Sequence, residues 1–318
     1  MTSIITNTSA MTALQTLKNI NSNLASAQNE ISTGKTIATA KDNAAIWSIT
    51  KVMESDVSGI DAIKTSLDLG GSSVSVAREA SESVVADLKK MQALVVNAQS
   101  ENVDRSTLQT QIDNLKGSIG KYVSSAQFNG MNLLNGKDGT GADYTPDANG
   151  TGPDGTEVNV LAALNRDTSG VVTTDTISIE RMSLAYTAPT GTPATPTGSP
   201  AGTEDFQTLM DSIVVDDGSG TAFDSDALQS ALEFVNAALS SATGVASYYG
   251  AKESQISSQS TFMGKLSDAM TTGIGTLIDA DMEEASARLT ALQTQQQLGI
   301  QALSIANQTP QNILSLFQ

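Results

Sequence analysis

Apolar residues recur every three or four positions at both ends of the 318-residue chain. Near the N-terminus the stripe consists of Ala10, Ala13, Leu17, Ile20, Leu24, Ala27 and Ile31. Near the C-terminus it consists of Ile278, Met282, Ala285, Leu289, Leu292, Leu303 and Ala306, with Gln296 and Gly299 at the positions between. This spacing predicts a helix at each end with a narrow apolar seam of the coiled-coil kind.

The two terminal segments are almost free of charge. Lys18 is the only charged residue before Glu30, and Arg288 is the only one after Glu284. A helix exposed to water normally carries a charged outer face, so we expect other protein to cover these segments. We therefore predict that the ends become ordered when neighbouring copies surround them, in contacts that repeat into a filament. The pattern alone is equally compatible with a dimeric coiled coil whose ends fray.

Longer stripes between the ends predict long helices. The longest stripe consists of Ile49, Met53, Ile60, Ile63, Leu67, Val74, Ala77, Val84, Leu88, Met91, Val95 and Ala98. Gly70-Gly71 weakens this helix, but the apolar phase continues beyond it. A third stripe runs from Leu108 to Ala126, and Asn129-Gly130 after it predicts a left-handed C-cap.

The middle of the chain has a different composition. From Gly136 to about Gly202 it is rich in Gly, Pro, Thr, Ala and Asp. Two segments within it, Val158–Leu164 and Val171–Ile179, are rich in β-branched residues, and a turn at Asp167–Gly170 separates them. This arrangement predicts a small β-hairpin. A helical pattern returns at Phe206–Val214 and continues from Leu228 to Met263.

The predicted fold class is mainly α. The N- and C-terminal halves are expected to form a long antiparallel coiled-coil or helical-bundle rod, with a small central insert that contains the β-hairpin. The predicted divisions are an N-terminal helix (1–43), N-terminal rod helices (44–135), the insert (136–205), a C-terminal rod helix (206–275) and a C-terminal helix (276–318).

Composition argues against several function classes. The formal net charge is −17, and no basic patch is present to bind phosphates, so nucleic acid is not an expected partner. The chain has neither His nor Cys. A zinc-binding His-Glu-x-x-His helix, a Cys nucleophile and a Ser-His-Asp triad are therefore excluded. Adjacent acids such as Asp216-Asp217 are more typical of a solvated surface than of an acid–base pair. We predict no catalytic, cofactor or metal site.

The termini show no targeting or membrane signal of a common kind. Residues 1–13 lack the basic and apolar regions of a Sec signal, and no apolar run reaches the length of a membrane span. We expect no membrane insertion, and we expect a dedicated export machine if the protein leaves the cell.

Three motifs resemble those of the bacterial flagellin family. Residues 31–45 contain Ile-Ser-Thr-Gly followed by Ala-Lys-Asp-Asn-Ala-Ala, and residues 127–130 read Gln-Phe-Asn-Gly. Residues 306–316 read Ala-Asn-Gln-Thr-Pro-Gln-Asn-Ile-Leu-Ser-Leu. The resemblance covers both terminal regions, approximately residues 1–135 and 225–318.

The resemblance implies a structural subunit, and not an enzyme, that polymerises into the flagellar filament for swimming motility. It implies an extracellular, secreted protein exported unfolded through the flagellar type III channel, with an export chaperone, the filament cap and hook-junction proteins as partners. It places both terminal seams in the inner tube of the filament. The implied subunit-interface residues are Leu17, Ile20, Leu24, Ile31, Met282, Leu289, Leu292, Leu303, Ile313, Leu314, Leu316 and Phe317.

The last four of these residues form an apolar tail. Pro310 is expected to bend or end the final helix before this tail. Contact with a chaperone or a neighbouring subunit and packing within the same chain remain equally open for the tail.

The resemblance also implies a segment that host innate receptors read. In the family this segment resembles Leu-Gln-Arg-x-Arg-Glu-Leu-x-x-Gln. The corresponding residues here include Leu88, Lys90, Gln92, Ala93 and Leu94. Gln92 stands in place of the second Arg, and Ala93 in place of the Glu, so a planar charged group and its ionic partner are both missing. We predict weak receptor activation.

Two other functions remain as alternatives. The hook–filament junction protein shares both terminal motifs, although the intact Pro-Gln-Asn-Ile-Leu-Ser-Leu ending favours flagellin. A secreted helical adhesin or effector would also be acidic and rich in heptads.

Overall fold

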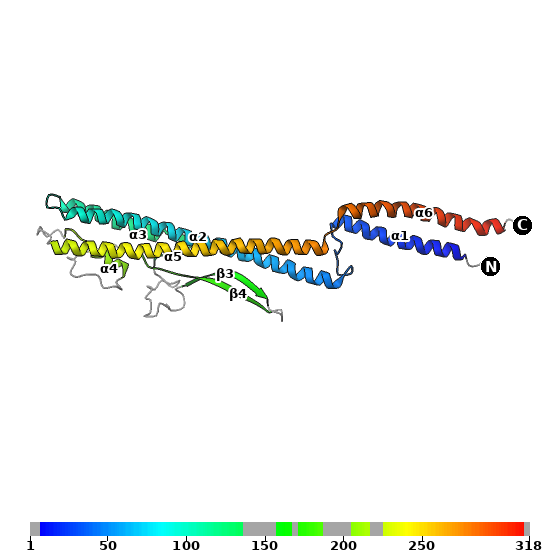
Figure 1. The fold of residues 1–318 in the computed structure, drawn as a ribbon, viewed down its shortest axis with the longest axis horizontal. Helices are drawn as coiled ribbons and strands as arrows, with labels where there is room; N and C mark the ends of the chain where they lie inside the picture. The colour runs from blue at the N-terminus through cyan, green and yellow to red at the C-terminus, as the bar shows by residue number, and fades with distance from the viewer. Residues whose placement is uncertain (1–6, 136–156, 167–170, 187–204, 217–224, 315–318) are drawn as a thin grey trace. The chain divides into compact units, whose positions relative to one another are not determined.

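The computed structural model describes residues 7–135, 157–166, 171–186, 205–216 and 225–314. The chain divides into two compact units, residues 1–58 with 266–318 (the terminal unit) and residues 59–265 (the central unit). Figure 1 shows the elements in chain order. They are α1 (Thr8–Thr33), α2 (Ala44–Ala98), α3 (Arg105–Ser125), β1 (Gln127–Phe128), β2 (Met131–Asn132), β3 (Glu157–Arg166), β4 (Val172–Glu180), α4 (Phe206–Asp211), α5 (Ser225–Ile278) and α6 (Met282–Leu314).

In the terminal unit, α1 and α6 lie side by side and antiparallel (Figure 1). Helix α1 ends at Thr33 because Gly34 adopts a left-handed conformation with φ of 69°, where a side chain would be strained. The Gly34 carbonyl accepts a hydrogen bond from the Ala280 N–H at 2.9 Å, and the Thr36 N–H donates to the Ile278 carbonyl at 2.7 Å. The turn after α1 is therefore joined to the turn before α6 by backbone pairing.

The sequence predicts that Pro310 bends or ends the last helix, and the helix does not end there, because α6 continues to Leu314. A proline has no N–H to donate to the carbonyl four residues earlier, which here belongs to Ala306. The side-chain amide of Asn7 donates to that carbonyl at 2.9 Å, while the Asn7 Oδ1 caps α1 by accepting from the Ala10 N–H at 3.0 Å. One side chain thus satisfies both the start of α1 and the backbone group that Pro310 leaves unpaired.

The core of the central unit lies along α2, α3 and α5. Every position of the predicted α2 stripe from Ile60 to Ala98 is buried. One row of buried side chains on α5 recurs every seven residues and consists of Leu228, Val235, Ala242, Tyr249, Ile256 and Met263. This strict heptad repeat keeps one face of α5 against the other helices over its whole length in this unit.

The predicted β-hairpin is confirmed. Strands β3 and β4 pair antiparallel, with Val158 opposite Ile179. The turn predicted at residues 167–170 lies outside the described residues. The register shifts beside Ala162, whose carbonyl accepts a hydrogen bond from Gln259 of α5 at 2.9 Å. The hairpin is therefore held against α5 at its bulge.

Two glycines of α2 allow β3 to approach closely. A Cβ atom on Gly70 would lie 2.5 Å from Cγ2 of Val160, and one on Gly59 would lie 2.8 Å from Cδ1 of Leu164. Real Cβ atoms do not approach other carbons so closely, so a larger residue at Gly70 would displace Val160, and one at Gly59 would require the end of the Leu164 side chain to move. This packing explains Gly70, the first residue of the Gly70-Gly71 pair, whereas Gly71 faces Ile256 of α5 at ordinary contact distance. Helix α2 runs through the pair without a break.

Two tyrosines of α5 fix the chain at the base of the hairpin. The hydroxyl of Tyr249 donates to the Leu133 carbonyl at 2.8 Å and accepts from the Met182 N–H at 3.1 Å. Tyr249 is fully buried, and burial raises its pKa well above the usual value. The neighbouring Tyr248 accepts from the Glu180 N–H at 2.9 Å. The two phenols tie the chain leaving β4 to α5, and Tyr249 also ties it to the segment after β2.

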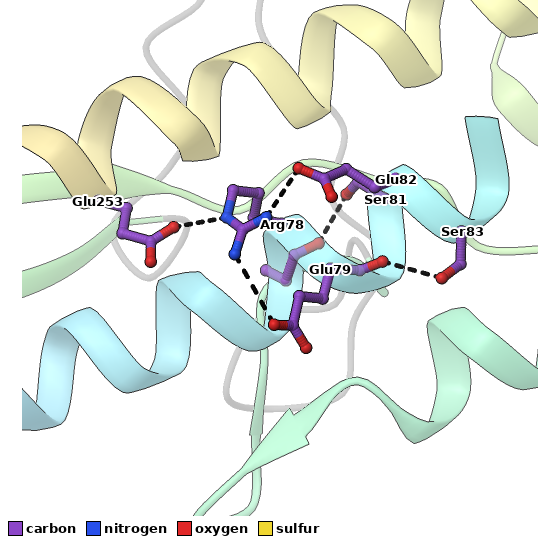
Figure 2. Close-up of polar contacts among 7 residues, drawn as sticks. Arg78, Glu79, Ser81, Glu82, Ser83 and Glu253 are labelled. Atoms are coloured by element: carbon purple, nitrogen blue, oxygen red, sulfur yellow. Dashed lines mark hydrogen bonds and ion pairs between the residues drawn. The ribbon is translucent and has the colours of Figure 1, made fainter. Parts of the chain in front are cut away.

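Arg78 links α2 to α5. Figure 2 shows its guanidinium between Glu253 of α5 and two acids of its own helix. The Arg78 Nε atom lies 2.6 Å from Glu253, and another guanidinium nitrogen lies 2.7 Å from Glu82. These hydrogen bonds, to Glu82 first and then Glu253, raise the pKa of Arg78 further above its already high value. A planar side chain that binds both helices at once fixes their relative register.

Asn129-Gly130 has a different role from the predicted helix cap. Helix α3 ends at Ser125, and the two residues form the turn between β1 and β2. Both have positive φ, 50° for Asn129 and 79° for Gly130. Asn-Gly is the preferred sequence of a two-residue hairpin turn that needs two positive φ angles. The sequence signal for a left-handed conformation was correct, but the element that uses it is a hairpin.

The predicted fold class is confirmed. The described chain is mainly helical, its long helices pack antiparallel within each unit, and a two-stranded hairpin is inserted between the N- and C-terminal halves.

Candidate subunit interface

The two terminal seams meet in α1 and α6. On α1, the seven predicted seam positions are half-buried or buried, and between them only Glu30 is also partly covered. On α6, Ala285 and Leu292 are buried, and Leu289 and Leu303 are half-buried. Leu17 packs over Gly299, where a Cβ atom would lie 3.2 Å from its Cδ1. The heptad pattern at the two ends therefore describes one antiparallel pair within the chain.

The predicted interface residues fall into three groups. Leu17, Ile20, Leu24, Ile31, Leu289, Leu292 and Leu303 lie on the face that joins α1 to α6. Met282, the first residue of α6, is 43% exposed. Ile313 and Leu314 lie in the last turn of α6, while Leu316 and Phe317 lie outside the described residues.

Polar contacts fix the alignment of the helix pair. The Gln296 side-chain amide donates to Asn21 at 2.7 Å near the middle of α1. Near the end of α1, Arg288 lies 3.8 Å from Glu30 and 2.9 Å from Glu284, one turn earlier on α6. Together these contacts favour one alignment of α1 with α6, because a shifted alignment would lose the hydrogen bond and the ion pair.

The outer faces of the pair also carry large apolar side chains, which the sequence analysis missed. Met11 and Leu14 of α1 are 63% and 45% exposed. Leu298 and Ile305 of α6 are 58% and 66% exposed, and Ile300 is also exposed. Exposed apolar side chains of this size make these faces candidates for contact with other protein.

A sequence signal for this outer face was available. Ala291, Leu298 and Ile305 recur every seven residues on α6, in a phase different from that of the seam. On α1, Met11, Leu14 and Lys18 follow steps of three and four, again outside the seam. A helix with two such stripes has two faces to cover, and one partner helix covers only one of them.

The segment corresponding to the receptor motif lies on α2. Leu88 is buried, and Leu94 is half-buried. The side-chain amide of Gln92 donates to Asn236 of α5 at 2.6 Å, and Lys90 pairs with Asp87 at 2.8 Å. Ala93 is exposed and adds no polar group.

The described residues show no group of three or more His, Asp, Glu or Cys side chains placed to bind a metal ion. In the same part of the chain, none of the helices combines the length and apolar character needed to cross a membrane.

Comparisons with known proteins identify the family. The family model for the bacterial flagellin N-terminal helical region matches residues 4–138, and that for the C-terminal helical region matches residues 232–317. The chain is 39% identical to a flagellin of Brucella melitensis over 321 residues, which include all of both chains. The chain belongs to the bacterial flagellin family. It is also similar to flagellin C of Rhizobium meliloti (36% identity over the full length of both chains) and to flagellin FljK of Caulobacter vibrioides (34%, covering 100% of this chain and 99% of the relative).

A solved structure confirms the fold of this flagellin. The structure of a putative flagellar hook-associated protein from Vibrio parahaemolyticus superposes with a TM-score of 0.54, covering 75% of this chain and 100% of that one. At 14% identity this likeness concerns the fold alone. The flagellin is a structural subunit of the extracellular flagellar filament, and flagellins are structural proteins, not enzymes.

Proposed function

We propose that this flagellin polymerises through the outer faces of α1 and α6, while the seam between them holds the pair together. The observation that carries the proposal is the exposure of Met11, Leu14, Leu298 and Ile305 on helices that are almost free of charge. Burying such side chains stabilises a contact by about 1.5–3 kcal/mol each. A charged helix face would be stable in water, but these faces have almost no charge. In the filament, neighbouring copies bury them.

The seam residues serve the same assembly in this proposal. Leu17, Ile20 and Leu24 are only half-buried between α1 and α6, so the pair is incomplete in a single chain. A neighbour placed along the open edge of the seam completes their burial. The α1–α6 pair is then only weakly stable in the free subunit, and the contacts with neighbours stabilise it in the filament.

Seeded polymerisation of the purified subunit tests the interface. Leu14→Gln and Ile305→Gln are expected to raise the critical concentration by roughly tenfold or more each, because about 1.4 kcal/mol corresponds to a factor of ten. The matched controls Leu14→Met and Ile305→Leu keep an apolar group of similar volume and are expected to polymerise like the parent. Sedimentation and electron microscopy give the polymer fraction, and circular dichroism confirms that the monomers fold. If the Gln variants polymerise as well as the controls, the outer faces are not the contact.

Charges introduced into the seam provide a second test. Leu24→Asp and Leu303→Asp place a carboxylate between two apolar faces without a partner, so assembly is expected to fail while the central unit stays helical. Normal filaments from either variant would contradict the seam assignment.

We also propose contacts with other proteins before and after assembly. The apolar residues Ile313, Leu314, Leu316 and Phe317 are suited to bind an export chaperone, with the filament cap and hook-junction proteins contacting the terminal unit in the polymer. Removing residues 309–318 is expected to abolish chaperone binding measured by calorimetry, whereas Leu14→Gln is expected to leave it unchanged. Equal chaperone affinity after the truncation would place the chaperone site elsewhere.

We also propose that this flagellin activates host innate receptors only weakly, because of the residues in the α2 segment that corresponds to the receptor motif. Gln92 is neutral and its amide is already bonded to Asn236, and Ala93 offers neither charge nor hydrogen bond. A reporter-cell assay is expected to show low potency for the parent and a gain for the Gln92→Arg, Ala93→Glu double variant. A parent potency equal to that of an enterobacterial flagellin would contradict the proposal.

A further inference from the structure

Lys18 is an unusual residue on α1. It is exposed, and within the described part of the chain it makes no ion pair. It continues the stripe of Met11 and Leu14 on the outer face, at steps of three and four residues. The only other cation on α1 or α6 is Arg288, which is occupied by Glu30 and Glu284. Polymerisation through the outer face therefore brings one uncompensated ammonium into an apolar contact.

An acid with complementary properties lies at the start of α6. Glu283 is exposed and, among the described residues, has no ion-pair partner, whereas the adjacent Glu284 binds Arg288. The first turn of α6 is capped by Asp281, which accepts from the N–H groups of Glu283 and Glu284 at 3.0 and 3.2 Å. The Glu283 carboxylate is therefore free to bind outside its own helix.

The two residues cannot meet within one chain. Leu17 and Ile20, on either side of Lys18, pack against Gly299 of α6. Glu283 lies 16 residues before Gly299 on the same helix, which corresponds to about 24 Å at 1.5 Å per residue. A direct ion pair between these side chains thus requires two copies of the chain.

We propose that Lys18 of one subunit forms an ion pair with Glu283 of a second subunit, displaced by about 24 Å along the axis of the α1–α6 pair. The proposal rests on the proposed polymerisation through the outer faces. A buried ammonium without a partner strongly disfavours assembly, and a carboxylate from the neighbour removes that penalty. Apolar stripes alone tolerate sliding by whole turns, whereas a single charge pair selects one displacement and suppresses the others.

Charge reversal tests the pairing. Lys18→Glu and Glu283→Lys are each expected to raise the critical concentration of seeded polymerisation on the order of tenfold or more, and the double reversal is expected to restore it to near the parent value. Lys121→Glu, which reverses an exposed lysine of the central unit, is the control for the change in net charge. If Lys18→Glu polymerises like the parent, or if the double variant assembles no better than the single ones, the pairing is wrong.

Zero-length cross-linking examines the native chain and does not depend on any variant folding. A carbodiimide joins an amine to a carboxylate only when they touch. Filaments assembled from a mixture of ¹⁵N-labelled and unlabelled subunits are expected to give a mixed-isotope peptide pair joining Lys18 to Glu283, and dilute monomers none. Filaments that yield no such pair contradict the inference.

The tests separate this inference from the interface on which it rests. Loss of assembly in Leu14→Gln and Ile305→Gln, combined with a tolerated Lys18→Glu, retains the interface and rejects the ion pair. If Leu14→Gln and Ile305→Gln both assemble normally, the apolar interface is wrong. The cross-linking experiment then still tests whether Lys18 contacts Glu283 of another subunit.

Discussion

The two units of this flagellin contain the same heptad pattern but reach different degrees of burial. In the central unit, Ile63, Leu67, Leu88 and Met91 of α2 have no exposed surface. In the terminal unit, Ala27 is the only seam residue of α1 that is buried, and Leu17, Ile20 and Leu24 stay half-exposed.

The number of neighbours explains this difference. Helix α2 lies beside α3 and α5 (Figure 1) and contacts the hairpin through Gly70, whereas among the described residues the stripe of α1 packs against α6. Two helices in contact leave the flanks of each seam residue open, and only further elements can close them. The central unit thus completes its core inside one chain, while the terminal unit retains exposed apolar side chains.

Truncating one leucine in each unit gives the largest contrast. Leu67→Ala creates a cavity in a closed core and is expected to lower the free energy of unfolding by about 3–5 kcal/mol. Leu24→Ala removes a half-exposed side chain and is expected to lower it by only about 1 kcal/mol in the monomer. Urea unfolding of the monomer followed by circular dichroism measures both. Equal losses would show that the terminal pair is as closed as the central core.

The stability of the central unit is expected to depend on pH, because its closed core buries a lysine. The terminal unit has no such buried lysine among its described residues. Burial lowers the pKa of Lys116 to about 8, against the opposing effect of Asp113 and Asp211. The unfolded chain binds more protons than the folded one between this pKa and the ordinary value of 10.5, so stability rises with pH across that window. The full change is on the order of 3 kcal/mol.

Urea unfolding at pH 7.5 and pH 9.5 detects this rise, and Lys116→Met is expected to reduce it. Lys18→Met is the matched control, since Lys18 is exposed in the terminal unit. A rise of the same size in Lys116→Met would mean that other groups cause it.

A smaller effect is expected where the hairpin joins the core. Tyr249→Phe keeps the ring but removes the hydroxyl that binds the Leu133 carbonyl and the Met182 N–H. The loss is expected to be about 1–2 kcal/mol, because the hydrogen bonds of the buried phenol disappear, although the Met182 N–H still donates to the Leu133 carbonyl at 3.0 Å. Thermal unfolding measures it. Tyr122→Phe, at an exposed position of α3, is expected to cost much less. A neutral Tyr249→Phe would show that the phenol does not hold the segment.

The smallest effect is expected at the ends of the terminal pair. Asn7→Asp retains an acceptor for capping α1 but loses the amide that donates to the Ala306 carbonyl. The expected loss is about 0.5–1.5 kcal/mol, and Asn7→Ala adds about 1 kcal/mol through loss of the cap. Amide hydrogen exchange of α6 in the monomer measures the change. Unaltered exchange in Asn7→Asp would mean that the carbonyl freed by Pro310 needs no partner.

Some features of the fold and of the candidate interface can be predicted from the sequence, and others cannot. The terminal seams, the helix stop at Gly34 and the β-hairpin follow from local spacing and turn chemistry, and the structure confirms them. The Asn129-Gly130 turn was misplaced because a left-handed pair suits a helix end and a hairpin equally well. The residues near Pro310 do not indicate that α6 continues, because the side chain that bonds to the Ala306 carbonyl belongs to Asn7, 303 residues earlier.

The sequence by itself determined which face of each helix is apolar, because a 3.5-residue repeat places those side chains on one side whatever lies opposite. Only the tertiary structure decided how completely each face is covered, because coverage depends on how many elements converge there. It gave Leu67 a closed core and Leu17 a half-open seam, and it left Met11, Leu14, Leu298 and Ile305 exposed on the outer face of the pair.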